Sequence, residues 1–175
     1  MRKAMHLMGS LTDEDVEWIG KNSVTALTPS GATLITQGKP IEDVFILLEG
    51  KLSVRTRGTG DREIAGLLAG EIVGEMSLVD SRPPSASVVA ARDSQVLVLS
   101  RATLNRKLSA DGAFAGRFYK GLAVLLADRL RKTTSNLGYG VWKEGEDPDE
   151  LDDMMMDSAS LGATRFDRLL KQQRP

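Results

Sequence analysis

The spacing of the hydrophobic residues changes twice along the chain, from a helical pattern to a strand pattern and back. Thr12 and Asp15 have the spacing of a capping box, in which each side chain bonds a backbone amide at the start of a helix. Val16 and Ile19 follow on one helical face. A short helix is therefore predicted from this box to about Asn22.

Between residues 33 and 99 the apolar residues form short runs that are rich in strand-forming types. Turn segments containing glycine or proline separate these runs at intervals of roughly ten residues, a spacing typical of an antiparallel sandwich or roll. Glu49-Gly50 is expected to form a tight hairpin between two of the strands. The predicted strands are 33–35, 44–48, 51–54, 64–68 and 96–99.

After residue 99 the helical spacing returns, first in a short segment, 101–108, and then in a long one, 114–137. Asp111-Gly112 separates the two segments. Strands first and helices after them is the order of an α+β protein. The predicted fold is an antiparallel β-roll or jelly roll with a short N-terminal helix and a long C-terminal helix.

One face of the long helix carries an apolar stripe. Its members recur at steps of three and four residues, while charged residues occupy the other faces. The stripe can bury against the chain's own roll or against a second copy. A homodimer is expected, because such a stripe is costly to expose on a free helix. The stripe consists of Tyr119, Leu122, Leu126, Leu130, Thr133 and Leu137.

The last part of the chain has a different composition. Residues 144–157 hold eight acidic residues and no basic one. Such a segment buries too little apolar area to offset its ordering entropy. The sequence therefore predicts one domain over residues 1–138 and an acidic flexible tail over residues 139–175. The tail is expected to be dispensable for folding.

A short helix is predicted at the end of this tail. Thr164 and Asp167 have the spacing of a second capping box. Phe166, Leu169 and Leu170 would share one side of the helix. This apolar side is a candidate binding site for a protein partner.

The composition excludes several classes of catalytic site. The chain has no cysteine, which excludes disulfides, thiolate zinc sites and thiol nucleophiles. Its single histidine, His6, precedes the predicted elements, so neither a Ser/His/Asp triad nor a multi-histidine metal site can form in the strand region. A protein that is not an enzyme and has no resident cofactor is expected.

Length and charge narrow the class of protein further. A chain of 175 residues is long enough for one well-buried core. A net charge of −1 argues against DNA binding, which normally needs a basic face. The longest apolar runs, 44–48 and 122–127, are far shorter than a membrane span. A cytoplasmic protein without DNA or membrane partners is expected.

The segment from residue 70 to residue 88 carries the candidate chemistry. Gly74 lets the backbone approach a ligand closely. The next amides, at the start of a short helical turn, would point at an anion such as phosphate. These amides belong to Glu75, Met76 and Ser77. A ligand-free alternative is a tight turn whose carboxylate is solvated.

Three further side chains complete the candidate site. The carboxylate of Glu75 can accept hydrogen bonds from sugar hydroxyls. Ser85 and Ala86, at the head of the next strand, offer a hydroxyl and small side chains where a compact ligand would pass over the chain.

This segment resembles the cyclic nucleotide-binding domain, the eight-stranded roll of the catabolite-activator family, of kinase regulatory subunits and of nucleotide-gated channels. The likeness extends over about residues 11–137. Its parts occur in the family's order, and no helix-turn-helix follows them. These parts are Gly31, Gly38, the strand end 44–50, Gly70, then 74–78, then 85–87, then the long helix.

The resemblance implies a role for each site residue. The residue at Glu75 would hold the ribose hydroxyl, the neighbouring amides the phosphate, and Ser85 the cyclic phosphate. Thr133 and Thr134 match helix positions that meet the purine, although plain helix surface is the alternative for both. The implied function is a regulatory sensor of cyclic AMP or cyclic GMP, and the alternative is a ligand-free dimerisation or scaffold domain.

The sequence departs from the family at the phosphate-binding arginine, which Pro84 replaces. A charge-assisted hydrogen bond contributes roughly 1.5 to 3 kcal/mol, so its loss is expected to weaken a cyclic nucleotide about 10- to 150-fold. Arg82 is the candidate substitute. Because Pro83-Pro84 favours an extended path, Arg82 starts about 6 Å further from the site and must fold back to reach it.

Overall fold

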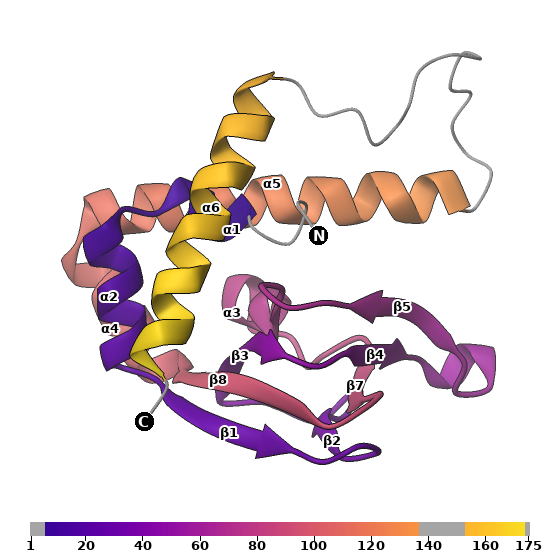
Figure 1. Cartoon of the computed structure of the whole chain (residues 1–175). Helices are drawn as coiled ribbons and strands as arrows, with labels where there is room; N and C mark the ends of the chain where they lie inside the picture. Colours follow the sequence, from indigo (N-terminus) through magenta and orange to yellow (C-terminus); the bar gives the residue numbers. More distant parts are fainter. Residues whose placement is uncertain (1–5, 137–152, 174–175) are drawn as a thin grey trace.

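The computed structural model describes residues 6–136 and 153–173. Two four-stranded antiparallel sheets form a roll, and the helices lie against it (Figure 1). In sheet order, the first sheet contains β1 (Val24–Thr28), β8 (Ser94–Ser100), β3 (Asp43–Glu49) and β6 (Ile72–Val73). The second sheet contains β2 (Thr33–Ile35), β7 (Ser87–Ala90), β4 (Leu52–Arg55) and β5 (Glu63–Leu67).

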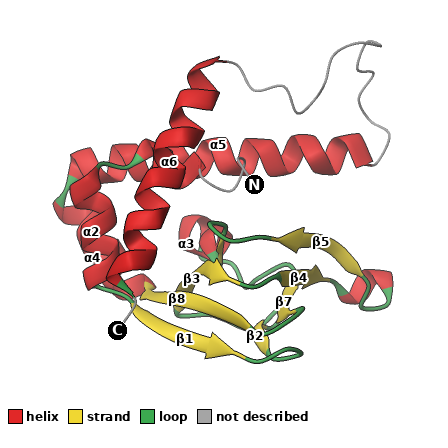
Figure 2. Cartoon of the chain, viewed as in Figure 1, coloured by secondary structure: helices red, strands yellow, loops and turns green. Residues whose placement is uncertain are grey.

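The helices gather on one side of the roll, except for one short helix between strands (Figure 2). This architecture confirms the predicted α+β roll with an N-terminal helix and a long helix after the strands. A short 3₁₀ turn, η2 (Arg57–Thr59), joins β4 to β5. The helices are α1 (His6–Ser10), α2 (Asp13–Lys21), α3 (Glu75–Asp80), α4 (Arg101–Ala110), α5 (Gly112–Asn136) and α6 (Asp153–Gln172).

The central strands of the first sheet are buried on both faces. In β3, Val44, Ile46 and Leu48 contact the helices, whereas Phe45 and Leu47 face the interior of the roll. Strand β8 divides its residues between the same two clusters. This double burial explains why 44–48 is a continuous apolar run rather than an alternating one.

The turn at Glu49-Gly50 is not the predicted hairpin. β3 pairs with β6 and β8, whereas β4 pairs with β5 and β7. The turn therefore carries the chain from one sheet to the other. Such a crossing and a hairpin have the same local turn residues, because pairing partners are set by the whole roll.

The capping box of α2 is confirmed. The amide of Thr12 donates to the Asp15 carboxylate at 2.8 Å, and the amide of Asp15 donates to the Thr12 hydroxyl at 3.2 Å. Arg117 of α5 also donates to Asp15, at 2.6 Å. These bonds to Thr12 and Arg117 lower the pKa of Asp15, against the opposing effect of burial. The box therefore also ties α2 to the long helix.

The C-terminal helix differs from the prediction. α6 has 20 residues and begins at Asp153, inside the acidic run. Acidic residues at a helix N-terminus are favoured by the helix dipole, so part of this run supports a helix instead of preventing one. Thr164 is not a cap: it lies within α6, and its hydroxyl donates to the Ser160 carbonyl at 3.3 Å.

α6 belongs to the core of the molecule. Phe166 and Leu169 are 3% and 0% exposed, in one cluster with Val16 and Ile19 of α2. Gly9 marks a close crossing of α1 and α6, since a Cβ there would lie 2.2 Å from the carbonyl oxygen of Ser158. The expectation of a flexible tail is therefore wrong for α6. The domain division at residue 138 stays a prediction and lies outside the described residues.

The apolar stripe of α5 divides between two environments. Leu122 is 2% exposed and packs in the core, whereas Tyr119 and Leu130 are 46% and 68% exposed. Leu137 lies outside the described residues.

Among the described helices, none combines the length and hydropathy needed to cross a membrane.

Candidate ligand-binding site

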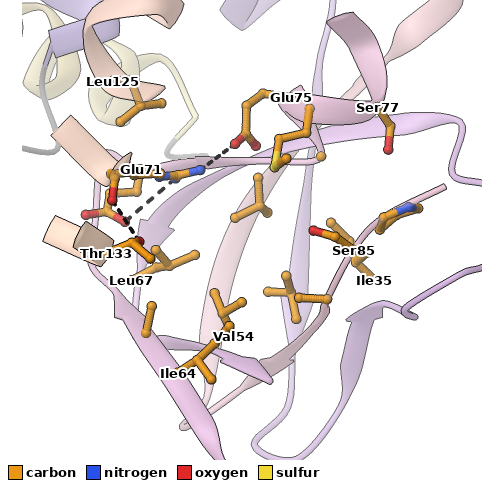
Figure 3. Close-up of a pocket in the computed structure, with 18 of the residues that line it drawn as sticks. Ile35, Val54, Ile64, Leu67, Glu71, Glu75, Ser77, Ser85, Leu125 and Thr133 are labelled. Atoms are coloured by element: carbon orange, nitrogen blue, oxygen red, sulfur yellow. Dashed lines mark hydrogen bonds and ion pairs between the residues drawn. The ribbon is translucent and has the colours of Figure 1, made fainter. Parts of the chain in front are cut away.

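A cavity of about 470 Å³ lies between the second sheet, α3 and α5. Leu125 and Thr133 reach it from α5, while Ile35 and Ser85 reach it from the roll (Figure 3). Its volume is within the range of cavities that hold small molecules. Its apolar wall includes Ile35, Val54, Ile64, Leu67, Val73, Val88 and Leu125.

The predicted glycine turn forms one end of this cavity. Gly74 has a φ of 87° and precedes α3, whose first residue is Glu75. A Cβ at Gly74 would lie 3.0 Å from the carbonyl oxygen of Asp43, so a larger residue is disfavoured by both conformation and space. Gly74, Glu75, Met76 and Ser77, which are expected to contact a ligand, all line the cavity.

Glu75 is buried and paired with an arginine. Its exposure is 2%, and a guanidinium nitrogen of Arg129 donates to its Oε1 (Figure 3). Arg129 also donates to the carbonyl of Ile72 at 2.7 Å and lies 4.0 Å from Glu71. Burial raises the pKa of Glu75, and the charge of Arg129 opposes this rise.

Sequence reasoning missed Arg129. The charged residues of the long helix, Arg129 among them, are expected on the faces away from the apolar stripe. One signal was available, because Arg129 precedes Thr133 by four residues and such pairs share a helix face. If Thr133 faces a ligand, Arg129 can reach the same space.

The structure brings Pro84, Ser85 and Ala86 to the cavity as well. The carbonyl of Pro84 accepts a hydrogen bond from the amide of Gly38 at 2.9 Å, which fixes this segment beside the turn that precedes β3. The side chain at the family's arginine position is therefore a lining residue without charge or hydrogen-bonding capacity.

Arg82 lies elsewhere. Its side chain is 84% exposed, its amide donates to Asp80 at 3.0 Å, and its Nε lies 3.8 Å from the same carboxylate. It is not among the cavity-lining residues. The predicted fold-back of Arg82 into the site is thus absent from this structure.

The two threonines of α5 take different positions. Thr133 lines the cavity, and its hydroxyl donates to the carbonyl of Arg129 at 2.9 Å. Thr134 is not among the lining residues, and its hydroxyl donates to the carbonyl of Leu130 at 2.5 Å. Only Thr133 is therefore placed to contact a bound molecule.

Arg101 does not line the cavity, but it bonds to Ser77, which does. At the start of α4, its guanidinium donates to the carbonyl of Ser77 at 2.6 Å and to that of Ile41 at 2.7 Å. It thereby links α3 to the helices that follow the roll.

Within the part of the chain that the structure describes, no group of three or more His, Asp or Glu side chains is arranged to hold a metal ion.

Comparison with known proteins gives a family match for the strand region of the chain. The model of the cyclic nucleotide-binding domain matches residues 27–111. Over this segment, just under half of its length, the chain is similar to cyclic nucleotide-binding domains. This match includes β2 to β8, α3 and the lining residues from Ile35 to Val88, and therefore covers the strand side of the cavity.

Two similar proteins are longer than the segments that match this chain. The cyclic AMP receptor protein of Thermus thermophilus is 34% identical over 140 residues, which are 77% of this chain and 62% of that protein. The Pycsar effector protein XpPycTIR of Xanthomonas perforans is 33% identical over 103 residues, 58% of this chain and 32% of that protein. The chain thus spans less than two thirds of either relative.

A solved structure supports the fold. The crystal structure of a cyclic nucleotide-binding domain from Methylobacillus flagellatus KT superposes with a TM-score of 0.70 at 26% identity. The match covers 81% of this chain and 85% of that one. The predicted roll architecture is therefore confirmed, and it is similar to that of the solved domain.

Proposed function

We propose that this protein is a non-catalytic regulatory module whose cavity binds a cyclic nucleotide weakly. One observation carries the proposal: the turn from Gly74 to Ser77, the buried carboxylate of Glu75 and the hydroxyl of Ser85 line a single cavity of a cyclic nucleotide-binding domain. Backbone amides and a carboxylate acceptor on one cavity suit a ligand that combines phosphate with sugar hydroxyls.

Weak affinity follows from the side chain of Pro84. A cyclic phosphate near Ser85 would meet a neutral ring where the family has a guanidinium. Arg82 is turned to solvent. Arg129 is already bonded to Glu75 and Ile72. The cavity thus offers directional contacts to the ligand but lacks a dedicated partner for its charge.

A ligand-free scaffold is the second candidate function, and one observation favours it. Arg129 neutralises Glu75 from within the chain, so the buried carboxylate has a partner without any ligand. A stable pair of this kind can hold α5 against the roll as a permanent structural link. The two candidates differ in whether the cavity binds any nucleotide.

We also propose that the protein is a cytoplasmic homodimer, with the exposed apolar residues of α5 as its interface. The role of the C-terminal tail in binding a protein partner stays a proposal. Phe166 and Leu169, the apolar residues first assigned to it, are buried inside the chain. A partner would have to use the exposed side of α6, where Leu161 is 45% exposed.

Replacing Pro84 by arginine tests the nucleotide site. If the Gly74–Ser77 turn has the family geometry, Pro84→Arg should strengthen binding of cyclic AMP or cyclic GMP about fivefold or more, equivalent to about 1 kcal/mol. Isothermal titration calorimetry on the full chain measures the change. Thermal melting of the variant shows that it is folded.

Arg82→Ala is the matched control, because it removes a guanidinium two residues from Pro84 that points to solvent. Its affinity should equal that of the wild type. Lost binding in Arg82→Ala would show that this arginine serves the site in solution. A folded Pro84→Arg protein that gains nothing with either nucleotide would exclude the phosphate site and leave the scaffold function.

A further inference from the structure

One face of α5 joins the cavity to the N-terminal helix α1. Leu125, Arg129 and Thr133 line the cavity and recur at steps of four residues along α5. One further step toward the N-terminus brings Gly121, which is buried against α1. A Cβ at Gly121 would lie 3.0 Å from Cδ1 of Leu7, so even an alanine there would press on α1. A shift of α5 at the cavity therefore acts on its contact with α1.

A second close contact holds α1 against α6. A Cβ at Gly9 would lie 2.2 Å from the carbonyl oxygen of Ser158, which leaves no space for a side chain. α1 contacts both α5 and α6, and Figure 1 shows it beside the point where these two helices cross. Because packed protein interiors are barely compressible, a helix held on both sides in this way transmits a shift of one neighbour to the other.

Arg165 of α6 adds charge-assisted bonds at the same junction. Its guanidinium donates to the carbonyl of Gly9 in α1 at 3.0 Å and to the carboxylate of Asp13 in α2 at 2.9 Å. The last carbonyls of a helix have no partner within the helix, so a cation near them satisfies a free acceptor. Arg168 forms a further ion pair with Asp13. α6 is thus bound to the end of α1 and to the start of α2.

The side chains between these contacts form one continuous core. Leu125, which lines the cavity, belongs to the same buried cluster as Leu7 of α1 and Phe166 of α6. Energetic coupling between distant sites is carried by contiguous packed networks of this kind. A packed route therefore leads from the cavity through α5 and α1 to α6.

We propose that α6 is the output element of the cavity: a ligand that shifts or rigidifies α5 changes the docking of α6 through α1. The inference rests on the proposed function for its ligand and deepens it by naming the element that carries the signal. Coupling between two sites is reciprocal, so a protein partner that draws α6 away would change the ligand affinity of the cavity. None of these three helices belongs to the matched family segment, residues 27–111.

Gly121→Ala tests the route without any ligand. The added methyl group presses on Leu7 and should loosen α1, so the amide exchange of α6 should rise at least about tenfold. Hydrogen–deuterium exchange of the full chain, read by mass spectrometry, measures this rise. Exchange in β4, a strand of the second sheet, is the internal reference for a loss of stability of the whole protein.

Gly116→Ala is the matched control, because it adds the same methyl group to α5 where no atom outside the local helix lies within 4 Å. Its α6 exchange should equal that of the wild type. Val96→Ala controls for a general loss of stability, since Val96 is buried in the separate core cluster inside the roll. It should not raise the ratio of α6 exchange to β4 exchange.

Arg165→Met approaches the same junction from α6 and serves if Gly121→Ala does not fold. It removes the bonds to Gly9 and Asp13. Exchange in residues 122–133 of α5, which include three cavity-lining residues that Arg165 does not bond, should then rise several-fold.

Cyclic AMP tests whether the cavity uses this route. In Pro84→Arg, saturating cyclic AMP should slow the exchange of α6 at least about threefold. The double variant Pro84→Arg/Gly121→Ala should still bind cyclic AMP by titration calorimetry, but its α6 exchange should no longer respond to the ligand, because the contact of α5 with α1 is disturbed.

The outcomes separate this inference from the proposed function. A folded Gly121→Ala protein whose α6 exchanges at the wild-type rate would overturn the inference and leave the nucleotide site standing. So would a Pro84→Arg protein that binds cyclic AMP with no change in α6 exchange. If neither the wild type nor Pro84→Arg binds a cyclic nucleotide, the proposed function falls, whereas the exchange of Gly121→Ala still decides whether α6 is coupled to α5.

Discussion

At the level of single residues, the pair between Arg129 and Glu75 joins α5 to the start of α3. Glu75 is 2% exposed, and burial raises its pKa while the charge of Arg129 opposes this rise, so the guanidinium compensates a charge that burial alone disfavours. Arg129→Met retains much of the aliphatic stem and removes the charge. The variant should lose about 3 kcal/mol of unfolding free energy at neutral pH, measured by urea denaturation.

The loss of unfolding free energy in Arg129→Met should depend on pH in a defined direction. Burial already raises the pKa of Glu75, and removing the opposing charge of Arg129 raises this pKa further. A folded protein that holds this proton more tightly than its unfolded chain is stabilised in acid and loses that stability as pH rises through the raised pKa. The difference in unfolding free energy between Arg129→Met and the wild type should therefore be small near pH 4, about the ordinary pKa of a glutamate. It should be largest near pH 7.

The double variant Glu75→Gln/Arg129→Met isolates the pair. The double variant has no buried carboxylate without a partner. It should therefore be more stable at neutral pH than Arg129→Met alone, and its unfolding free energy should lack the added pH dependence. Comparison with wild type at each pH cancels the contributions of the other carboxyl groups to the pH dependence, because both proteins retain them. An Arg129→Met loss that is equal at all pH values would mean that packing, not charge, causes it.

The site was predictable from the sequence where one short segment forms it. Gly74 to Ser77 and Ser85 are close in sequence and line the same cavity, as expected. Arg129 was missed because the pair with Glu75 joins residues 54 positions apart. A charged residue on a helix usually faces solvent, and nothing local distinguishes one whose long side chain reaches another element.

At the level of elements, α6 shows what hydrophobic patterning does not detect. The face that packs inward carries Ala159 and Gly162 besides Phe166 and Leu169, and all four are buried. Two of these residues are small, so the stripe has little hydrophobicity although it has the spacing of a packed helix. Small side chains instead allow a close approach of helices, as at Gly9 of α1.

β1 was missed for a related reason. It is an edge strand that pairs only with β8 within the described sheets, and Val24 and Leu27 are 67% and 82% exposed. No buried alternation marks such a strand in the sequence. The predicted segments match β2, β3, β4, β5 and β8 to within about two residues, whereas no bounds were predicted for β6 or β7.

A substitution at Leu169 measures how much the packing of α6 stabilises the molecule. The side chain is fully buried against α2, so Leu169→Ala should cost about 2 to 5 kcal/mol of unfolding free energy through lost burial and a residual cavity. Urea denaturation followed by circular dichroism measures this loss. Leu161→Ala, the same substitution at a 45% exposed position of α6, should cost much less. Equal and small losses in both variants would show that α6 does not pack against α1 and α2 in solution.

At the level of the whole molecule, α5 both lines the cavity and presents an apolar surface. Arg129 and Thr133 reach the cavity, while Tyr119 and Leu130 are exposed. Tyr119 and Leu130 lie about three helical turns apart and thus share one face. Burying this face against a second copy would place the ligand-contacting helix at the subunit interface. A change in the contact between Arg129 and Glu75 would then act on a helix that directly contacts the second copy.

The dimer prediction is tested on that face. Leu130→Asp should convert a dimer to a monomer, because a charge at a 68% exposed interface position is costly to desolvate, and it should leave the fold intact. Leu126→Asp is a poorer choice, since Leu126 packs partly on the chain's own core. Leu27→Asp, on the edge strand β1 at 82% exposure, is the matched control and should remain dimeric. Light scattering at tens of micromolar gives the masses. A wild type of monomeric mass, or a dimer that Leu130→Asp leaves unchanged, would rule out this face as the interface.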